Sequence, residues 1–280
     1  MKVKYLSKKR LEELHQIISD KDKDILRSLE KCRYLSTGQV RRLHFTDSKN
    51  STAGHRMANW ITAKLRNYGL VEILERYIGG VHGGSNAHIW TLTESGAKLL
   101  HLNDAGYIKR RRTFQPSEKF ASHTLAIAEA YVRIVELCRG YQLELIQAEL
   151  EPECWRDYTE DGKPATLKPD MFVITAGSQY EDIFFIEIDC GTEAPSKVMS
   201  KHRRYIRYHS SGIERKRYDV FPLVVWLVNS RSRQETLKEY LAEDDTIPEE
   251  FKSIFAIVMP DEFEKLILCG VEVSPEKGVA

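Results

Sequence analysis

The sequence predicts an α+β fold in two domains, from its length, its charge distribution and the order of its periodic segments. A chain of 280 residues is long enough for two hydrophobic cores. Residues 1–115 contain 22 Lys and Arg against 11 Asp and Glu, a net charge of +11, whereas the rest contains 20 against 30, a net charge of −10. Helices with one hairpin are predicted in the first part, and strands alternate with helices in the second.

The segment from Ser51 to Tyr68 is predicted to be an amphipathic helix, with Ser51 or Thr52 as its N-cap. On a helical projection its apolar side carries Ala53, Met57, Trp60, Ile61, Leu65 and Tyr68. Its opposite side carries Thr52, His55, Asn59, Thr62 and Arg66. Such polar side chains can hydrogen-bond to base edges and phosphates. The segment is therefore either a DNA-reading helix or an ordinary helix with a solvated face.

The neighbouring segments favour the DNA-reading alternative. A helix is predicted over residues 24–31, and a short helix follows the N-cap Ser36. After residue 68 come a strand over 70–78, a Gly-rich tip over 79–86, a return strand over 87–92 and a helix capped by Thr93. This order resembles a winged helix-turn-helix domain. The resemblance implies that residues 51–68 are the recognition helix and 79–86 the wing, although a Gly-rich tip also suits a loose turn.

Duplex DNA is the partner that this resemblance implies. A basic first part is the electrostatic footprint expected of a DNA-binding module. The candidate DNA-binding residues of this part are Arg41, Arg42, Thr52, His55, Arg56, Asn59, Thr62, Arg66 and His82.

Domain boundaries follow from the same pattern. A basic segment over residues 1–20, either a flexible arm or a helix, precedes the winged module over 21–102. The linker predicted over 103–119 contains the run Lys109, Arg110, Arg111 and Arg112, which either is solvated or contacts phosphate. The second domain is expected over 120–270, and a weakly ordered tail over 271–280.

Composition excludes several classes of protein. Hydrophobic residues make up 42% and charged residues 30% of the chain, as in soluble globular proteins. No apolar run reaches the length of a membrane span, and no secretory leader follows Met1. The five cysteines are scattered, odd in number and without a CxxC pair, so neither a disulfide framework nor a zinc knuckle is indicated. We expect a cytoplasmic protein without membrane association.

The second domain is predicted to open with a helix over residues 120–140. Strands follow over 142–150, 167–175 and 182–189, with a polar turn or hairpin loop over 151–164. A helix over 193–209 precedes a strand over 220–229, whose nearly continuous apolar run predicts burial on both faces. A helix over 232–242 and a strand over 254–259 complete the domain.

This order resembles the core of the PD-(D/E)XK nuclease superfamily, an α/β sandwich. Pro169-Asp170 matches the start of one family strand, and Glu187-Ile188-Asp189 matches the acidic residue and its followers on the next. The resemblance implies that Asp170 and Glu187 hold Mg²⁺ or Mn²⁺, with Glu129 and Asp189 as further ligands. Mg²⁺ prefers hard oxygen ligands and lowers the pKa of an attacking water.

The sequence departs from that family at Asp189, which stands where the family has lysine. Lys201 on the next helix is the candidate replacement, because relatives of the family also carry the lysine on that helix. Lys197 and Arg204 share its helix face and are further candidates for DNA contact. The alternative without a function is that Glu187 and Asp189 are ordinary solvated or salt-bridged acids at a strand end.

A narrower resemblance follows from four segments in a fixed order. They are HTLAIAEAYVRI, LKPDMFVI, FFIEIDCGTE and KHRRYIRY, and they lie behind the winged module. Together they resemble the replication-relaxation family of Gram-positive plasmids and integrative elements, over about residues 20–245. This implies a double-stranded-DNA-binding accessory protein acting in replication, relaxation or transfer, with replication or relaxation proteins, or a second copy of the chain, as partners. Two alternatives stay open: a Mg²⁺-dependent endonuclease using Asp170, Glu187 and Lys201, and a winged-helix transcription regulator.

Overall fold

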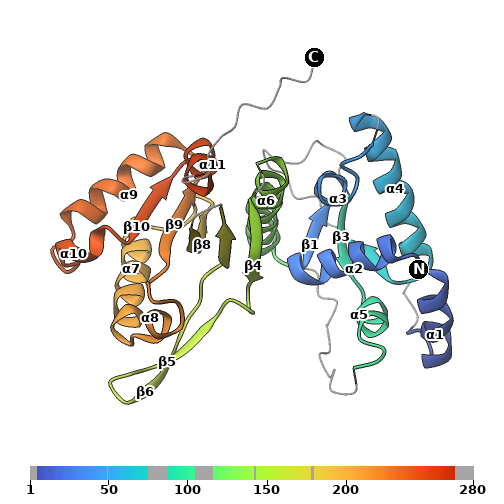
Figure 1. The fold of residues 1–280 in the computed structure, drawn as a ribbon, viewed down its shortest axis with the longest axis horizontal. Coiled ribbons are helices and arrows are strands. Elements are labelled where there is room, and N and C mark those ends of the chain that lie inside the picture. The colour runs from blue at the N-terminus through green and yellow to red at the C-terminus, as the bar shows by residue number, and fades with distance from the viewer. Residues whose placement is uncertain are drawn as a thin grey trace. The chain divides into compact units, whose positions relative to one another are not determined.

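The computed structural model of the chain describes residues 5–48, 50–74, 88–104, 116–141, 143–177 and 180–268. The chain is mixed α/β, as predicted, and divides into two compact units, residues 1–132 and 133–280 (Figure 1). We call them the first and the second unit. None of the helices in the described ranges is both long and apolar enough to cross a membrane.

The first unit combines helices with a small antiparallel sheet. Its helices are α1 (Lys8–Ile17), α2 (Asp20–Cys32), α3 (Thr37–His44), α4 (Ser51–Asn67) and α5 (Glu94–Leu100). Its strands are β1 (Tyr34–Ser36), β2 (Val71–Ile73) and β3 (Ile89–Leu92), in the sheet order β1-β3-β2. The core includes Leu26, Leu35, Leu65 and Leu70, all fully buried. The predicted wing (79–86), His82 and the run 109–112 lie outside the described residues.

Helix starts in this unit are fixed by side-chain caps. Ser36 accepts a hydrogen bond from the backbone N–H of Gln39, and Thr93 accepts one from Gly96, as the sequence predicts. The predicted cap of α4 was one or two residues late. Asn50 is its N-cap, because its side-chain oxygen accepts the backbone N–H of Ala53 at 2.8 Å.

The N-terminal segment settles on one of its two predicted alternatives over the described residues. Residues 8–17 form α1, which packs against α5 and buries Leu11 and Leu14, with Ile18 buried just beyond it. This apolar stripe explains why the segment is a helix rather than a free arm.

The long helix α6 (Glu118–Gly140) forms as predicted, but the division between the units falls inside it, after Val132, and not in the 103–119 linker. Its first half packs within the first unit. The rings of Phe120 and Tyr34 meet edge to face at 6.5 Å, and Gln39 donates to the backbone oxygen of Leu125. In its second half, Arg133 pairs with Glu264 of the second unit.

The second unit is built on a mixed sheet in the order β10-β9-β8-β7-β4. The strands are β4 (Glu144–Leu150), β7 (Met171–Ala176), β8 (Glu181–Asp189), β9 (Leu223–Val228) and β10 (Phe255–Val258). The pairs β4–β7 and β7–β8 are antiparallel, and β8–β9 and β9–β10 are parallel. The predicted strands are therefore present, and β9 is almost wholly buried, as its apolar run predicts.

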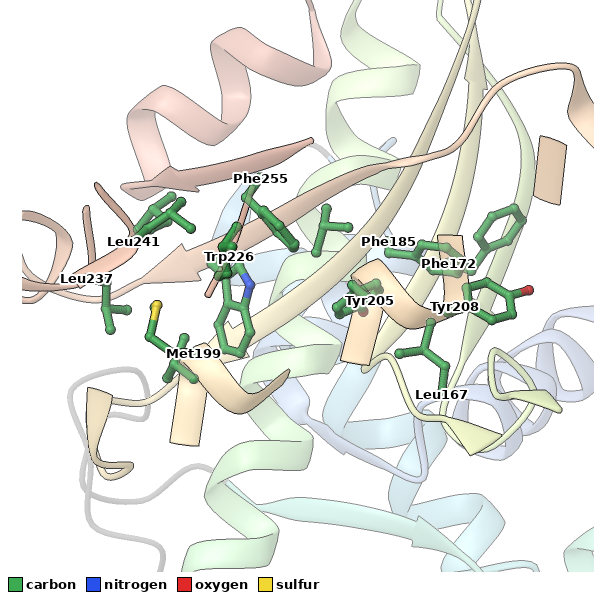
Figure 2. Close-up of a cluster of buried hydrophobic side chains, with 14 of the residues drawn as sticks. Leu167, Phe172, Phe185, Met199, Tyr205, Tyr208, Trp226, Leu237, Leu241 and Phe255 are labelled. Carbon is green, nitrogen blue, oxygen red and sulfur yellow. The ribbon is translucent and has the colours of Figure 1, made fainter. Parts of the chain in front are cut away.

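Two helices, α7 (Pro195–Ser210) and α9 (Arg231–Glu243), share a core with one face of this sheet. Figure 2 shows the core cluster, in which Tyr205 and Tyr208 of α7 lie near Phe185 and Phe172 of the sheet. Trp226 and Phe255 continue the cluster toward Met199 and α9. This layer holds α7 against the ends of β7 and β8.

The sequence prediction missed four smaller features of this unit. The polar stretch after β4 forms the hairpin β5 (Arg156–Glu160) and β6 (Lys163–Leu167), because Asp161 and Gly162 both take the positive φ that a tight two-residue turn needs. The hairpin packs on α7 through buried Tyr158 and Leu167. Three short helices also went unpredicted: α8 (Ile213–Tyr218), α10 (Glu249–Lys252) and α11 (Pro260–Ile267).

Candidate functional site

Three acids meet at adjoining ends of β7 and β8. Asp170 immediately precedes β7, and Glu187 and Asp189 end β8. Side chains alternate along a strand, so Glu187 and Asp189 share the face of Phe185, and Asp170 shares that of its partner Phe172. All three acids are nearly buried, with exposed fractions of 7%, 0% and 5%. They therefore point to the same side of the sheet, toward α7.

Glu187 is held by two side chains one helical turn apart on α7. Lys201 Nζ donates to Glu187 Oε2, and the Tyr205 hydroxyl donates to Oε1 at 2.5 Å. Residues four apart share a helix face, which lets both reach one carboxylate. The Lys201 ammonium also lies 5.7 Å from the centre of the Trp226 ring. The predicted lysine is thus beside the predicted acid.

Asp170 is positioned by the backbone around it. Its Oδ2 accepts the backbone N–H of Ile188 at 2.7 Å. The β7–β8 ladder ends where Met171 meets Ile186, so the Asp170 side chain satisfies a strand amide beyond the ladder. Just upstream, the buried Cys154 thiol donates to the carbonyl oxygen of Pro169 at 3.0 Å and fixes the Pro-Asp turn.

The electrostatics join Asp170, Glu187 and Lys201 in one environment, which with Tyr205 we call the carboxylate site. Burial raises the pKa of Glu187 to about 8, and the charge of Asp170 adds to the rise while Lys201 and Tyr205 oppose it. Burial alone would lower the pKa of Lys201, but the charges of Glu187 and Asp170 raise it overall. Lys201 therefore stays cationic and offsets the negative charge of the two acids.

Asp189 does not join this set, contrary to its predicted role as a metal ligand. Its Oδ2 accepts Arg233 Nε of α9 at 2.7 Å, and its Oδ1 accepts the backbone N–H of Gly191 at 2.5 Å. Arg233 also donates to the carbonyl oxygen of Glu193 at 2.7 Å. The ion pair neutralises Asp189 and links the end of β8 to α9.

Glu129 lies in the first unit, where its carboxylate accepts Arg42 Nη1 at 2.6 Å and Gln39 Nε2 at 3.2 Å, both from α3. Its predicted place among the metal ligands is not supported, because Arg42 already neutralises its charge and Gln39 donates to its other oxygen. Across the described ranges, no group of three or more His, Cys, Asp or Glu side chains could hold a metal ion. The expected four-acid set is therefore reduced to Asp170 and Glu187, two oxygen donors suited to Mg²⁺.

On α4, the structure brings most of the predicted polar face to the surface. Thr52, His55, Arg56, Asn59 and Arg66 are all exposed. Thr62 is a correction, because it is fully buried and its hydroxyl donates to the carbonyl oxygen of Ala58 at 2.7 Å.

The predicted apolar side of α4 is also rotated. Met57 and Trp60 are 47% and 60% exposed, while Gly54 and Ala58 face inward. A Cβ on Gly54 would approach Arg41 Cγ to 3.2 Å, so small residues are needed where α4 meets α3. Arg41 and Arg42 are thereby drawn partly into packing and pairing within the unit. Lys197 and Arg204 on α7 are exposed, as a role in DNA contact requires.

Two residues, one in the carboxylate site and one beside it, carry no predicted function. Tyr205 was placed on the buried flank of α7, and its spacing of four from Lys201 is the signal that could have found its hydroxyl. Arg233 lies 44 residues beyond Asp189, and no local pattern joins the two.

Residues 26–224 match the family described as replication-relaxation, which is more than half of the chain. The chain belongs to the replication-relaxation family. The matched region of this replication-relaxation protein contains α4 and all four residues of the carboxylate site. Membership indicates a role related to replication or relaxation. Searches of curated proteins and of solved structures each returned no match.

Proposed function

We propose that this replication-relaxation protein binds duplex DNA through α4, as an accessory protein of a plasmid or integrative element. The observation that carries the proposal is a row of exposed polar side chains on a firmly anchored helix. Thr52, His55, Asn59 and Arg66 are exposed along α4 at spacings of three, four and seven residues, which keep them near one side of the helix. These residue types donate and accept hydrogen bonds with base edges and phosphates.

The anchoring of α4 supports this role, because a reading helix must hold its side chains in register. Lys64 Nζ pairs with Asp22 Oδ2 at 2.6 Å, and Asp22 is fully buried in the capping box of α2. On the inner side, Ile61 and Leu65 are buried in the core. The helix-turn-helix order of α3 and α4 and the net charge of +11 over residues 1–115 point the same way.

The test uses the full chain and labelled duplexes selected from a random pool. Binding should weaken steeply as salt rises, because phosphate contacts release counterions. His55→Ala and Asn59→Ala should each reduce affinity for the selected duplex by about 1–3 kcal/mol while changing affinity for random duplex little. Gln16→Ala on the exposed side of α1 is the matched amide control and should leave both affinities unchanged. Absence of salt-dependent duplex binding would refute the proposal.

A second candidate function is metal-dependent cleavage of DNA, favoured by one observation: Asp170, Glu187 and Lys201 gather at one strand end. The carboxylates of Asp170 and Glu187 would hold Mg²⁺ or Mn²⁺, which supplies an activated water when bound. Lys201 would offset negative charge there and orient a phosphate oxygen. Against this, each acid already has a partner within the protein. We therefore place cleavage second, and propose that this domain organises a DNA end or a replication or relaxation protein of the element.

Supercoiled plasmid distinguishes the two functions. With either metal, the accessory protein should leave the plasmid intact at every concentration that binds duplex. A nuclease should nick or linearise it, and Asp170→Asn and Glu187→Gln should each abolish that cleavage without altering duplex binding. Glu193→Gln is the control, since Glu193 is an exposed carboxylate of the same region. Cleavage that survives both site substitutions would exclude the carboxylate site as its source.

A further inference from the structure

An exposed aromatic side chain stands beside the carboxylate site. Trp155 is 38% exposed, and the Lys168 ammonium lies 4.3 Å from the centre of its ring. Of the four tryptophans in the chain, Trp90 and Trp226 are buried, and Trp60 is exposed on α4. Trp155 is thus the exposed indole of the second unit, and it carries a cation on one face.

The Trp155–Lys168 pair is fixed to the turn that holds Asp170. Trp155 follows Cys154, whose thiol donates to the Pro169 carbonyl oxygen at 3.0 Å. Lys168 precedes Pro169, and Asp170 comes next. Burial raises the pKa of the Cys154 thiol, and the negative charges of Asp170 and Glu187 nearby raise it further. The indole and the ammonium therefore border the carboxylate site on the side of the β5–β6 hairpin.

Helix α7 borders the site on the other side and is basic. Its sequence contains no Asp or Glu, although the chain after residue 115 has a net charge of −10. Lys197 and Arg204 are exposed on the helix face that carries Lys201, and neither is ion-paired with a carboxylate in the described part of the chain. Helix α7 packs on β5 and β6, and Arg204 is close enough to Tyr158 of β5 for its charge to act on the tyrosine hydroxyl. The basic helix face therefore adjoins the hairpin that Trp155 and Lys168 flank in the sequence.

We propose that an unpaired DNA strand binds across this surface, with one base stacked on Trp155 and its phosphates held by Lys168, Lys197 and Arg204. Proteins that bind single strands combine an aromatic platform with a narrow basic track, and both are present here. A duplex hides its base faces and so offers Trp155 no base to stack on. The proposal deepens the DNA-associated function, but it concerns a surface separate from α4.

The acids of the site do not oppose this binding. Lys201 neutralises Glu187, and Arg233 neutralises Asp189. Asp170 is buried and satisfies the Ile188 amide. The buried acids are therefore satisfied within the protein, and Lys168, Lys197 and Arg204 are exposed.

The test measures binding of the full chain to labelled oligothymidylate of about 12 nucleotides, a length within the range of single-strand sites. Trp155→Ala should weaken binding about tenfold or more, because it removes the stacking face. Trp155→Phe should keep most of the affinity, and thermal unfolding should show both variants folded. In a Trp60→Phe background, the oligonucleotide should quench indole emission, and Trp155→Phe should remove that quenching.

The outcomes separate this inference from the proposed function. Equal oligothymidylate affinity for wild type and Trp155→Ala would overturn the inference, as would unchanged indole emission. Loss of duplex binding alone would remove the proposed role of α4 and leave the single-strand site standing. Loss of oligothymidylate binding in Trp155→Ala with duplex binding retained is the expected result.

Discussion

Two buried glutamates of the second unit have nearly the same partners. Glu187 is 0% and Glu214 is 1% exposed. Each accepts a tyrosine hydroxyl from α7, Tyr205 at 2.5 Å for Glu187 and Tyr208 at 2.6 Å for Glu214. Each is also paired with one cation, Lys201 or Arg156. Burial and a charged partner alone would therefore mark both as candidate sites.

The surroundings of Glu187 and Glu214 differ in the cation that each glutamate is paired with. Arg156 uses its fork to reach Glu214 at 3.1 Å and Glu149 at 2.9 Å, and its guanidinium lies 4.5 Å from the centre of the Phe172 ring. It fastens β5 to β4 and α8. Lys201 is a point charge on a flexible stem, its side chain is 25% exposed, and it feels a second acid, Asp170. Arg156 therefore cross-links three elements, whereas Lys201 is a cation within reach of solvent.

The largest expected effect comes from breaking the Arg156 cross-link. Arg156→Ala leaves the buried carboxylate of Glu214 and the partly exposed one of Glu149 without their cation. It should lower the free energy of unfolding by about 3–5 kcal/mol. Urea unfolding of the full chain, followed by circular dichroism, measures the change. Arg156→Lys is the matched control, because it keeps the charge but cannot form both bonds or stack equally, and it should recover part of the loss. If Arg156→Ala lowers the free energy of unfolding less than Arg203→Ala does, Arg156 is not a cross-link.

His202 follows Lys201 on α7 and tests what burial does to a titratable side chain that has no hydrogen-bond partner in the described ranges. Both ring nitrogens are buried and lack a hydrogen-bond partner in the described ranges, and the ring packs on Trp226 and Phe255. Burial lowers its pKa from 6.5 to about 3; Asp244 opposes the shift and Arg203 adds to it. Below pH 6.5 the unfolded chain gains a proton that the folded chain excludes.

Stability should therefore be lost as pH falls from about 6.5 toward 3, by about 2 kcal/mol at pH 5. His202→Leu removes the titrating group and two unsatisfied nitrogens, so it should flatten this slope and raise stability at pH 5. Unfolding midpoints at pH 5 and 7.5 provide the measurement. The same slope in His202→Leu as in wild type would assign it to other groups.

The smallest effect is expected at Lys201. Lys201→Met should lower the free energy of unfolding by about 1 kcal/mol, because the pKa of Glu187 is raised to about 8. This carboxyl can take up a proton when its cation is removed, and the methionine stem still packs. The loss should be well below that of Arg156→Ala under the same conditions. If Lys201→Met lowered the free energy of unfolding as much as Arg156→Ala, Lys201 would be a cross-link too. The contrast between Lys201 and Arg156 would then be wrong.

Asp170, Glu187 and Lys201 of the carboxylate site could be predicted from the sequence because the motifs that carry the nuclease resemblance are local. Pro169-Asp170 and Glu187 stand at predicted strand ends, and Lys201 falls on a helix face that follows from its spacing. Asp189 was misassigned because its partner, Arg233, is joined to it only by the parallel arrangement of β8 and β9 and the helix that follows. Glu129 was misassigned because α6 serves both units, which its uniform helical pattern conceals.

The rotation of α4 has a different cause. A hydropathy pattern assigns Met57 and Trp60 to the core because they are large and apolar. In the structure, close packing against α3 selects Gly54 and Ala58, which are small, and Thr62 satisfies its own hydroxyl within the helix. Size complementarity between two helices depends on the partner, so periodicity alone could not assign this face. The β5–β6 hairpin was missed as paired strands because its outward residues are polar.

The burial of the Cys154 thiol, which donates to the Pro169 carbonyl oxygen, bears on which cysteines of the chain can be labelled chemically. Burial raises the pKa of Cys32 to about 12 and that of Cys138 to about 11, and it raises that of Cys154 as well. Maleimides react with thiolates, so these three should resist alkylation in the folded chain. Cys190 is partly exposed and adjoins Asp189. With Cys269 replaced by serine, a dye on Cys190 would report on the carboxylate site without disturbing the core.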